Sequence, residues 1–285
     1  MPQPITSRDP EGVQVMGVVS EAFDGLGLIP ARVRQLYENR PELRRDLEEL
    51  LSRYTTYDRF AGYDSGYRRI KTFEEQLRIL HPYFPEYVDP NDMIAPQARI
   101  AGAEGCFLML DRRVLGPSYS EAVKKLFNAL NEQHSGQFEN RLVDPLDEMH
   151  LRQATSKERI FAYLASKESD HPILVLQAQF GLRYRDYAGT EVFGKMTKNE
   201  FPLGVYEVGN MLLTHPECLQ TEDDPWIDCP GDVLYLDACG PLKMVPFFCI
   251  NQDGKLTFGT HSPGLTRSGG RIGLATGFLP PDHQS

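Results

Sequence analysis

The stretch FPLGVYEVGNMLLTHPECLQTEDDPWIDCPGD (residues 201–232) is the part of the sequence from which the fold is read most directly. Its apolar residues first recur at helical spacing, which predicts a helix that opens at Pro202 and ends near Thr214. Its second part is rich in carboxylates and is interrupted by prolines, so it predicts a connection. The fold class then depends on the elements that flank this helix.

Predicted strands flank the helix on both sides. Residues 173–175 are continuously apolar, which predicts a strand inside a sheet. After the helix, two apolar runs surround Asp253-Gly254, a pair that favours a tight hairpin turn. Residues 271–280 (RIGLATGFLP) predict a last strand. The C-terminal end of the chain is therefore expected to be rich in β-structure.

Predicted helices dominate the earlier part of the chain. Residues 118–133 are the clearest helix, because Ser118 and Glu121 form a capping box ahead of an apolar stripe. Residues 155–168 repeat this design, with Thr155 as the cap. Helical spacing also occurs at residues 30–40, 41–54 and 73–81. Residues 13–23 could form a helix or a strand, and the sequence leaves this open.

We therefore predict an α+β protein. Residues 1–96 form a mainly helical N-terminal region, packed on a mixed, largely antiparallel sheet. Residues 97–285 form an α+β domain with a β-rich C-terminal end. The boundary follows a connection punctuated by prolines, which ends near Pro96. A chain of 285 residues has the length of one large domain or two smaller ones.

The charge of the chain limits its partners. It carries 30 Lys and Arg against 40 Asp and Glu, a net charge of −10. An acidic protein repels the phosphates of nucleic acids and anionic membrane surfaces. The sequence also lacks a run of about 18 apolar residues and the pattern of a secretory signal. The expected partner is a protein or a small molecule, not nucleic acid or a membrane.

The cysteines indicate the cellular compartment. There are five, an odd number, and several lie in apolar runs such as GCFLML (residues 105–110) and PFFCI (residues 246–250). This pattern is typical of buried free thiols in a reducing environment. We therefore expect a cytoplasmic protein.

The segment after the predicted helix contains candidate metal ligands. His215 and Cys218 are three residues apart at the helix end, and Cys229 follows, with Cys239 or Asp232 as a fourth group. Structural zinc takes four such ligands. No C-x-x-C pair is present, so no cofactor is firmly implied. In the alternative, His215 ends the helix, Cys229 is a buried thiol and the acidic tract is a solvated loop.

Residues 54–71 have the most unusual composition, with several tyrosines and arginines. Tyr57, Tyr63, Tyr67 and Arg68 could form a binding face, because Tyr and Arg are enriched at recognition surfaces. In the alternative, the tyrosines pack the helical region onto the sheet.

A glycine-rich segment, GLTRSGGRIG (residues 264–273), contains Arg267 and Arg271. These arginines could bind an anion. The segment lacks the Lys-Ser/Thr ending of a phosphate-binding P-loop. The alternative is a flexible turn before the last strand.

The layout of the C-terminal half resembles that of an uncharacterised family of actinobacterial proteins of unknown function. The resemblance rests on ILVLQAQFG, LLTHPECL, CPGD, VPFFCI, GKLTFG and IGLATGF, in this order. It implies a similar succession of strand, helix and strands. It implies no activity, cofactor or catalytic residue.

The sequence contains no G-x-S-x-G elbow and no other catalytic template with proper spacing. We therefore expect a binding or regulatory module for a protein or a small molecule. The alternative is an enzyme that acts on a small molecule in a pocket between the helical half and the sheet, assisted by zinc if the metal site exists. His215, Asp228 and Cys229 are the polar residues expected there.

Overall fold

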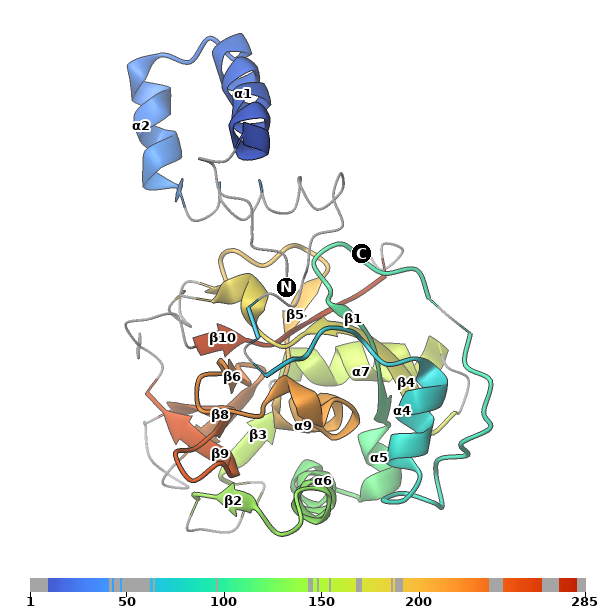
Figure 1. The fold of residues 1–285 in the computed structure, drawn as a ribbon. Helices are drawn as coiled ribbons and strands as arrows, with labels where there is room; N and C mark the ends of the chain where they lie inside the picture. Colours follow the sequence, from blue (N-terminus) through green and yellow to red (C-terminus); the bar gives the residue numbers. More distant parts are fainter. Residues whose placement is uncertain are drawn as a thin grey trace. The chain divides into compact units, whose positions relative to one another are not determined.

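The computed structural model describes residues 10–40, 43, 47, 62–63, 65–95, 97–142, 146–147, 149–153, 155–167, 171–185, 187, 192–235, 243–262 and 272–280. The chain divides into two compact units, Met1–Tyr57 and Asp58–Ser285. The secondary structure of both is labelled in Figure 1.

The first unit contains two helices, α1 (Pro10–Gly25) and α2 (Pro30–Glu38). The open question about residues 13–23 is thus decided in favour of a helix. Pro30 begins α2, where its fixed φ angle suits the first helical turn. None of the side chains described in α1 and α2 is buried. The helix predicted for residues 41–54 lies almost wholly outside the described residues.

The second unit contains the remaining elements. In chain order they are α4 (Phe73–Leu80), β1 (Gly105–Leu110), α5 (Arg112–Leu115), α6 (Tyr119–Gln133), β2 (Phe138–Asn140), β3 (Leu151–Gln153), α7 (Thr155–Lys167), β4 (Ile173–Gln179), η1 (Leu182–Tyr184), β5 (Glu200–Pro202), α9 (Val205–Thr214), η2 (Pro216–Cys218), β6 (Trp226–Asp228), β7 (Asp232–Tyr235), β8 (Lys243–Ile250), β9 (Leu256–His261), β10 (Ile272–Leu274) and β11 (Thr276–Phe278).

The strands form two sheets. One has the order β1-β4-β11-β5 and is antiparallel throughout. The other has the order β10-β6-β8-β7-β3, with β9 paired to β8 and β2 paired to β9. Only β10–β6 and β2–β9 are parallel among the described pairings. The predicted α+β class, with a mixed and largely antiparallel arrangement, is confirmed.

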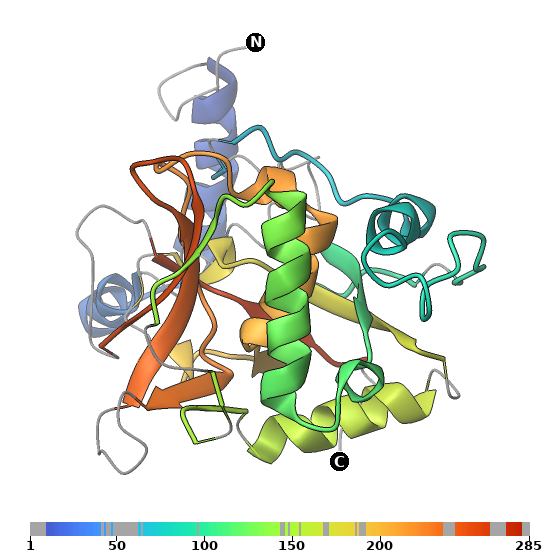
Figure 2. The same ribbon diagram turned by 90° about the horizontal axis from the view of Figure 1, so that it is seen from below.

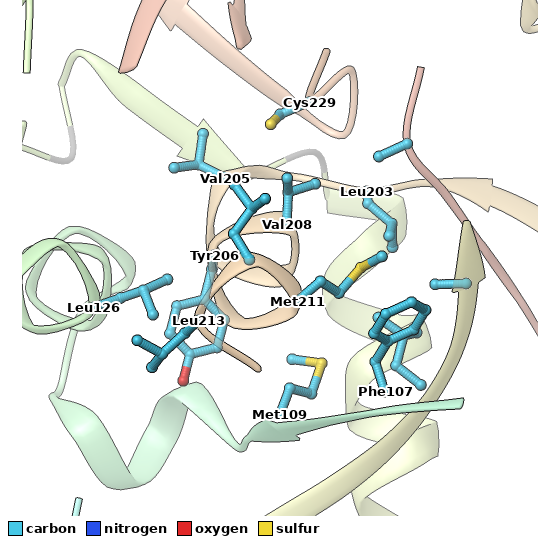
Figure 3. Close-up of a cluster of buried hydrophobic side chains, with 14 of the residues drawn as sticks. Phe107, Met109, Leu126, Leu203, Val205, Tyr206, Val208, Met211, Leu213 and Cys229 are labelled. Carbon is cyan, nitrogen blue, oxygen red and sulfur yellow. The ribbon is translucent and has the colours of Figure 1, made fainter. Parts of the chain in front are cut away.

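Helix α9 is the centre of the second unit. Figure 2 shows the green α6 alongside the orange α9, with β1 and β4 on one side and β8 and β9 on the other. Every residue of α9 is buried, so the helix is covered all round instead of along one stripe. Figure 3 shows the apolar side chains that surround it. The close approach of α6 requires Gly209, because a Cβ there would lie 2.5 Å from Cδ2 of Leu126.

The predicted start of this helix is wrong by three residues. Pro202 does not open the helix; it ends strand β5, opposite Thr276 of β11. The helix begins at Val205, after Gly204, and Glu207 accepts a hydrogen bond from the Gly204 N–H. A side-chain cap supplied by the third helical residue thus sets the start, and not the proline.

Other local predictions are confirmed. Ser118 accepts a hydrogen bond from the N–H of Glu121 at the start of α6. The predicted hairpin is β8–β9, in register from Ile250↔Leu256 to Val245↔His261. Its turn contains Gly254 with φ of +74°, a conformation that favours glycine. The domain boundary near residue 96 stays a prediction, although α4, which precedes it, packs against β1 and α9.

Candidate functional site

The acidic tract of residues 217–232 is not only a connection, because it contains strand β6, and three of its carboxylates, Asp224, Asp228 and Asp232, are buried. The prediction of a fully solvated loop is therefore wrong. Asp224 accepts hydrogen bonds of 2.8 Å from the backbone N–H groups of Ser65, Gln220 and Thr221. It ties the tract to a segment far away in the sequence, and this role is structural.

Asp228 pairs with a histidine that sequence reasoning did not identify. Its Oδ1 lies 2.8 Å from Nε2 of His261, and both groups are buried. Nδ1 of His261 must donate to the carbonyl oxygen of Ser262, which can only accept. Burial raises the pKa of Asp228, and the hydrogen bond to His261 counteracts this effect. The two side chains therefore share one proton on the second sheet.

His215, the first metal candidate, follows the last residue of α9, as predicted. Its Nε2 accepts a hydrogen bond of 2.9 Å from the N–H of Lys71, so the ring proton is on Nδ1, which faces Thr214 Oγ1 at 2.9 Å. Burial, together with the charge of Lys71, lowers the pKa of His215 to about 3. The ring is neutral, and both nitrogens are hydrogen-bonded within the protein.

The two cysteine candidates, Cys218 and Cys229, are buried free thiols. Figure 3 draws Cys229 with the apolar side chains around α9. Burial raises the pKa of both thiols, which keeps them protonated. No group of three or more His, Cys, Asp or Glu side chains is placed to hold a metal ion in the described part of the chain. The geometry therefore does not support a zinc site at His215, Cys218 and Cys229.

The predicted tyrosine–arginine face is mostly core. Tyr63 and Tyr67 are buried, and their rings meet edge to face at 4.9 Å. The Tyr63 hydroxyl donates to Oε1 of Glu104 at 2.7 Å. Arg68 is exposed, but its guanidinium donates to the backbone oxygens of Tyr63 and Tyr67. These tyrosines pack their segment against the rest of the second unit, so they cannot form a binding face.

Three other predicted ligand-binding residues cannot be placed. Tyr57, Arg267 and Arg271 lie outside the described residues. Their proposed roles, in a recognition face and in anion binding, stay predictions.

The most concentrated group of charges is one that the sequence did not reveal. Nζ of Lys157 lies 2.8 Å from Oε2 of Glu207 and 3.2 Å from Oδ1 of Asp232, and all three side chains are buried. The hydroxyl of Tyr119 donates to Oδ2 of Asp232. This oxygen also accepts from the N–H of Val205 at 2.8 Å. The cluster therefore caps the N-terminus of α9 inside the core.

The charges of this cluster stabilise one another. Burial alone lowers the pKa of Lys157, but Asp232 and Glu207 outweigh it, and the net pKa is raised. Burial raises the pKa of Asp232, against the attraction of Lys157. Two glycines, Gly204 and Gly231, make room for the ammonium: a Cβ on Gly231 would lie 2.6 Å from Nζ of Lys157. Every charged group of the cluster has a partner, which is the arrangement expected of a structural ion cluster.

A cavity of about 80 Å³ lies beside Glu207. Apolar residues such as Met109 and Phe161 line it, together with Arg112 and Arg113 of α5. Arg113 is engaged with Asp111, which accepts from its Nε at 2.8 Å. The cavity has about half the volume of one that binds benzene, so it accepts only a few non-hydrogen atoms.

In the first unit, large apolar side chains are exposed, whereas the groups described above in the second unit are buried polar side chains. Eight large apolar side chains of α1, α2 and their connection are 39% to 67% exposed: Val13, Met16, Val18, Phe23, Leu26, Ile29, Val33 and Tyr37. We call these eight residues the helical apolar surface. Apolar side chains gathered on short helices usually mark an interaction site. Sequence reasoning missed this surface, although the helical spacing of its residues was a usable signal.

No protein-family model matches the chain, and comparisons with curated proteins and with solved structures also give no match. The resemblance to an uncharacterised actinobacterial family stays a prediction. Within the described residues, no helix combines the length and the apolar character needed to cross a membrane.

Proposed function

We propose that this protein works by binding another protein chain through the helical apolar surface of α1 and α2. One observation carries the proposal. The eight side chains of this surface are large, apolar and exposed, and none of the side chains described in the two helices is buried. Covering such a surface releases free energy in proportion to its apolar area.

The lengths of the helices support a binding role. α1 has 16 residues and α2 has 9. A helix as short as α2 is marginal in water without tertiary packing, because the limit lies at about 12–15 residues, and α1 is only slightly longer than this limit. A partner that covers the apolar surface supplies this packing, so binding and helix formation are coupled. Recognition through an amphipathic helix works in this way.

The chemistry of the second unit favours binding over catalysis. The candidates for acid–base or nucleophilic roles are buried, and the protein itself supplies their hydrogen-bond partners. His215, Asp228 and Lys157 are each hydrogen-bonded to fixed partners within the protein. An enzyme of the expected kind needs such groups together in one concave site.

Hydrogen exchange of the purified chain at low concentration tests this proposal. The amides of α1 and α2 are expected to exchange much faster than those of α9, and a dye that binds apolar surfaces is expected to fluoresce. Met16→Glu with Val18→Glu should remove most of the dye signal. Glu86→Gln, at an exposed position of the second unit, is the control. Slow exchange in α1 of a chain that sedimentation shows to be monomeric contradicts the proposal, because its apolar surface is then already covered within one chain.

The cavity beside Glu207 favours a second candidate function, the binding of a small molecule by the second unit. Its apolar lining residues, buried carboxylate and two arginines suit a small polar compound with a short apolar part. Ligand-observed NMR with small amines and carboxylic acids tests this candidate. Ala162 lines the cavity and is exposed, so Ala162→Trp should fill the cavity and abolish binding. Equal binding to the variant contradicts this candidate.

A further inference from the structure

The two helices of the first unit carry opposite charges. The charged residues of α1 are Glu11, Glu21 and Asp24, and it has no Lys or Arg. In and directly after α2, Arg32, Arg34 and Arg40 outnumber Glu38. The acidic Glu21 and Asp24 and all four charged residues of the α2 region are exposed. An acidic helix and a basic helix, both with apolar side chains exposed, complement each other.

The charge of the chain is distributed unevenly between the units. Residues 1–57 contain 7 Arg, no Lys and 9 Asp and Glu, so their net charge is 7 − 9 = −2. The remaining residues carry 23 basic and 31 acidic side chains, so their net charge is 23 − 31 = −8. Two copies of the chain therefore repel each other mainly through the second unit. The first unit is the part that a second copy can approach at the least electrostatic cost.

The size of the helical apolar surface fits a partner of its own kind. A standard protein interface buries about 800 Å² on each partner. A buried Val, Leu, Ile, Phe or Met side chain contributes an area on the order of 100 Å². Seven of the eight side chains of the helical apolar surface are of this class, the eighth is Tyr37, and all eight are 39% to 67% exposed. They therefore provide roughly half of the area that one side of a standard interface needs.

From these observations we infer that the partner of the helical apolar surface is a second copy of the same chain. α1 of each copy packs against α2 of the other in a symmetric dimer. This inference rests on the proposed function and names its partner. In a two-fold dimer every contact occurs twice, so the acidic α1 meets the basic α2 at both places. Phe23 and Met16 of one copy then pack on Val33 and Tyr37 of the other.

A charge exchange between the helices tests the inference in the full chain. Glu21→Arg with Asp24→Arg makes α1 basic, and Arg32→Glu with Arg34→Glu makes α2 acidic. Each double variant alone is expected to dimerise at least about tenfold more weakly than the wild type, because like charges then face each other. A mixture of the two variants is expected to regain a dimer, since each altered helix meets an opposite charge. Sedimentation over a range of concentrations measures all three cases.

The control places the same charge changes on the second unit. Glu86→Arg with Glu132→Arg alters two exposed positions outside the helices and is expected to leave dimerisation unchanged. Because the altered residues of α1 and α2 are exposed, the unfolding transition of the second unit should be the same in every variant. This transition shows that the variants are folded.

The possible outcomes separate the two proposals. The inference is overturned if the wild-type chain dimerises and both double variants of the helices dimerise as tightly as the wild type. A wild-type chain that stays monomeric while α1 exchanges fast also overturns it, and the proposed function then stands with a different protein as partner. A monomer in which α1 is protected from exchange overturns both, because the helices are then covered by their own chain.

Discussion

Lys157 places an ammonium group where no water reaches it, between two carboxylates that come from distant parts of the chain. Such a group is stable only while its partners stay in place. At the residue scale, the behaviour of this protein therefore depends on a few buried polar side chains whose partners are fixed.

Lys157→Met should test the buried ion cluster. The change leaves Glu207 and Asp232 buried without a cation between them, and we expect the free energy of unfolding to fall by about 3–5 kcal/mol. Urea denaturation followed by the fluorescence of Trp226, the single tryptophan, measures it. Lys124→Met, on the exposed side of α6, should change stability by no more than about 0.5 kcal/mol. If the two substitutions lower the free energy of unfolding equally, Lys157 does not stabilise a buried ion cluster.

His215 should make stability depend on pH. The folded protein keeps this ring neutral down to a pKa of about 3, whereas the unfolded chain takes up the proton near pH 6.5. Between these values the unfolded state binds more protons, so the free energy of unfolding falls as the pH falls.

His215→Gln should remove this part of the pH dependence. Between about pH 6 and pH 4, we expect wild-type stability to fall by roughly 1.4 kcal/mol more per pH unit than that of the variant. Denaturation at several pH values measures the two slopes. Asn131→Gln, an exchange of one uncharged side chain for another at an exposed position of α6, should keep the wild-type slope. Parallel curves for wild type and H215Q rule out a buried neutral His215.

At the element scale, the same residue type has opposite roles in two helices. Gly209 of α9 faces Leu126 of α6 with no space for a methyl group, whereas a Cβ added at Gly17 of α1 would meet no described atom of another element within 4 Å. A helix in the core and a helix with exposed apolar side chains therefore respond differently to the same substitution.

Gly209→Ala should destabilise the second unit by about 1–3 kcal/mol, because overpacking outweighs the better helix propensity of alanine. Gly17→Ala should increase the helix content of the chain. Within the described residues, no close contact opposes the added methyl group there, and the intrinsic helix propensity favours alanine over glycine by about 1 kcal/mol. Denaturation measures the first effect and far-ultraviolet circular dichroism the second. Stabilisation by both substitutions means that α6 and α9 do not pack as closely as described.

At the scale of the whole molecule, two shortened chains distinguish between alternative boundaries. A chain that begins at Asp58 keeps the buried Tyr63, Tyr67, Leu77 and Leu80, so its unfolding midpoint should equal that of the full chain. A chain that begins at Gln97 loses these core residues and should not unfold cooperatively. Urea denaturation of both chains gives the result. A cooperative transition in the second chain favours the predicted boundary near residue 96.

The sequence alone determined the features that depend on neighbouring residues. The Ser118–Glu121 cap, the Asp253-Gly254 turn and the apolar strand Ile173–Gln179 each carry their signal within a few positions, and so the α+β class could be predicted. Tertiary structure alone decided which polar groups are buried together. Lys157 and Asp232 are 75 positions apart, and no local pattern links them.

Contacts between distant segments also decided which candidate binding residues are buried and which are exposed. Tyr63 and Tyr67 have the composition of a recognition surface, but packing of their segment against the rest of the second unit buried them. The exposed side chains of α1 and α2 have the composition of a core, but the described structure leaves them uncovered. Composition determines how much free energy a side chain gains when it is buried, whereas the meeting of distant segments determines whether it is buried.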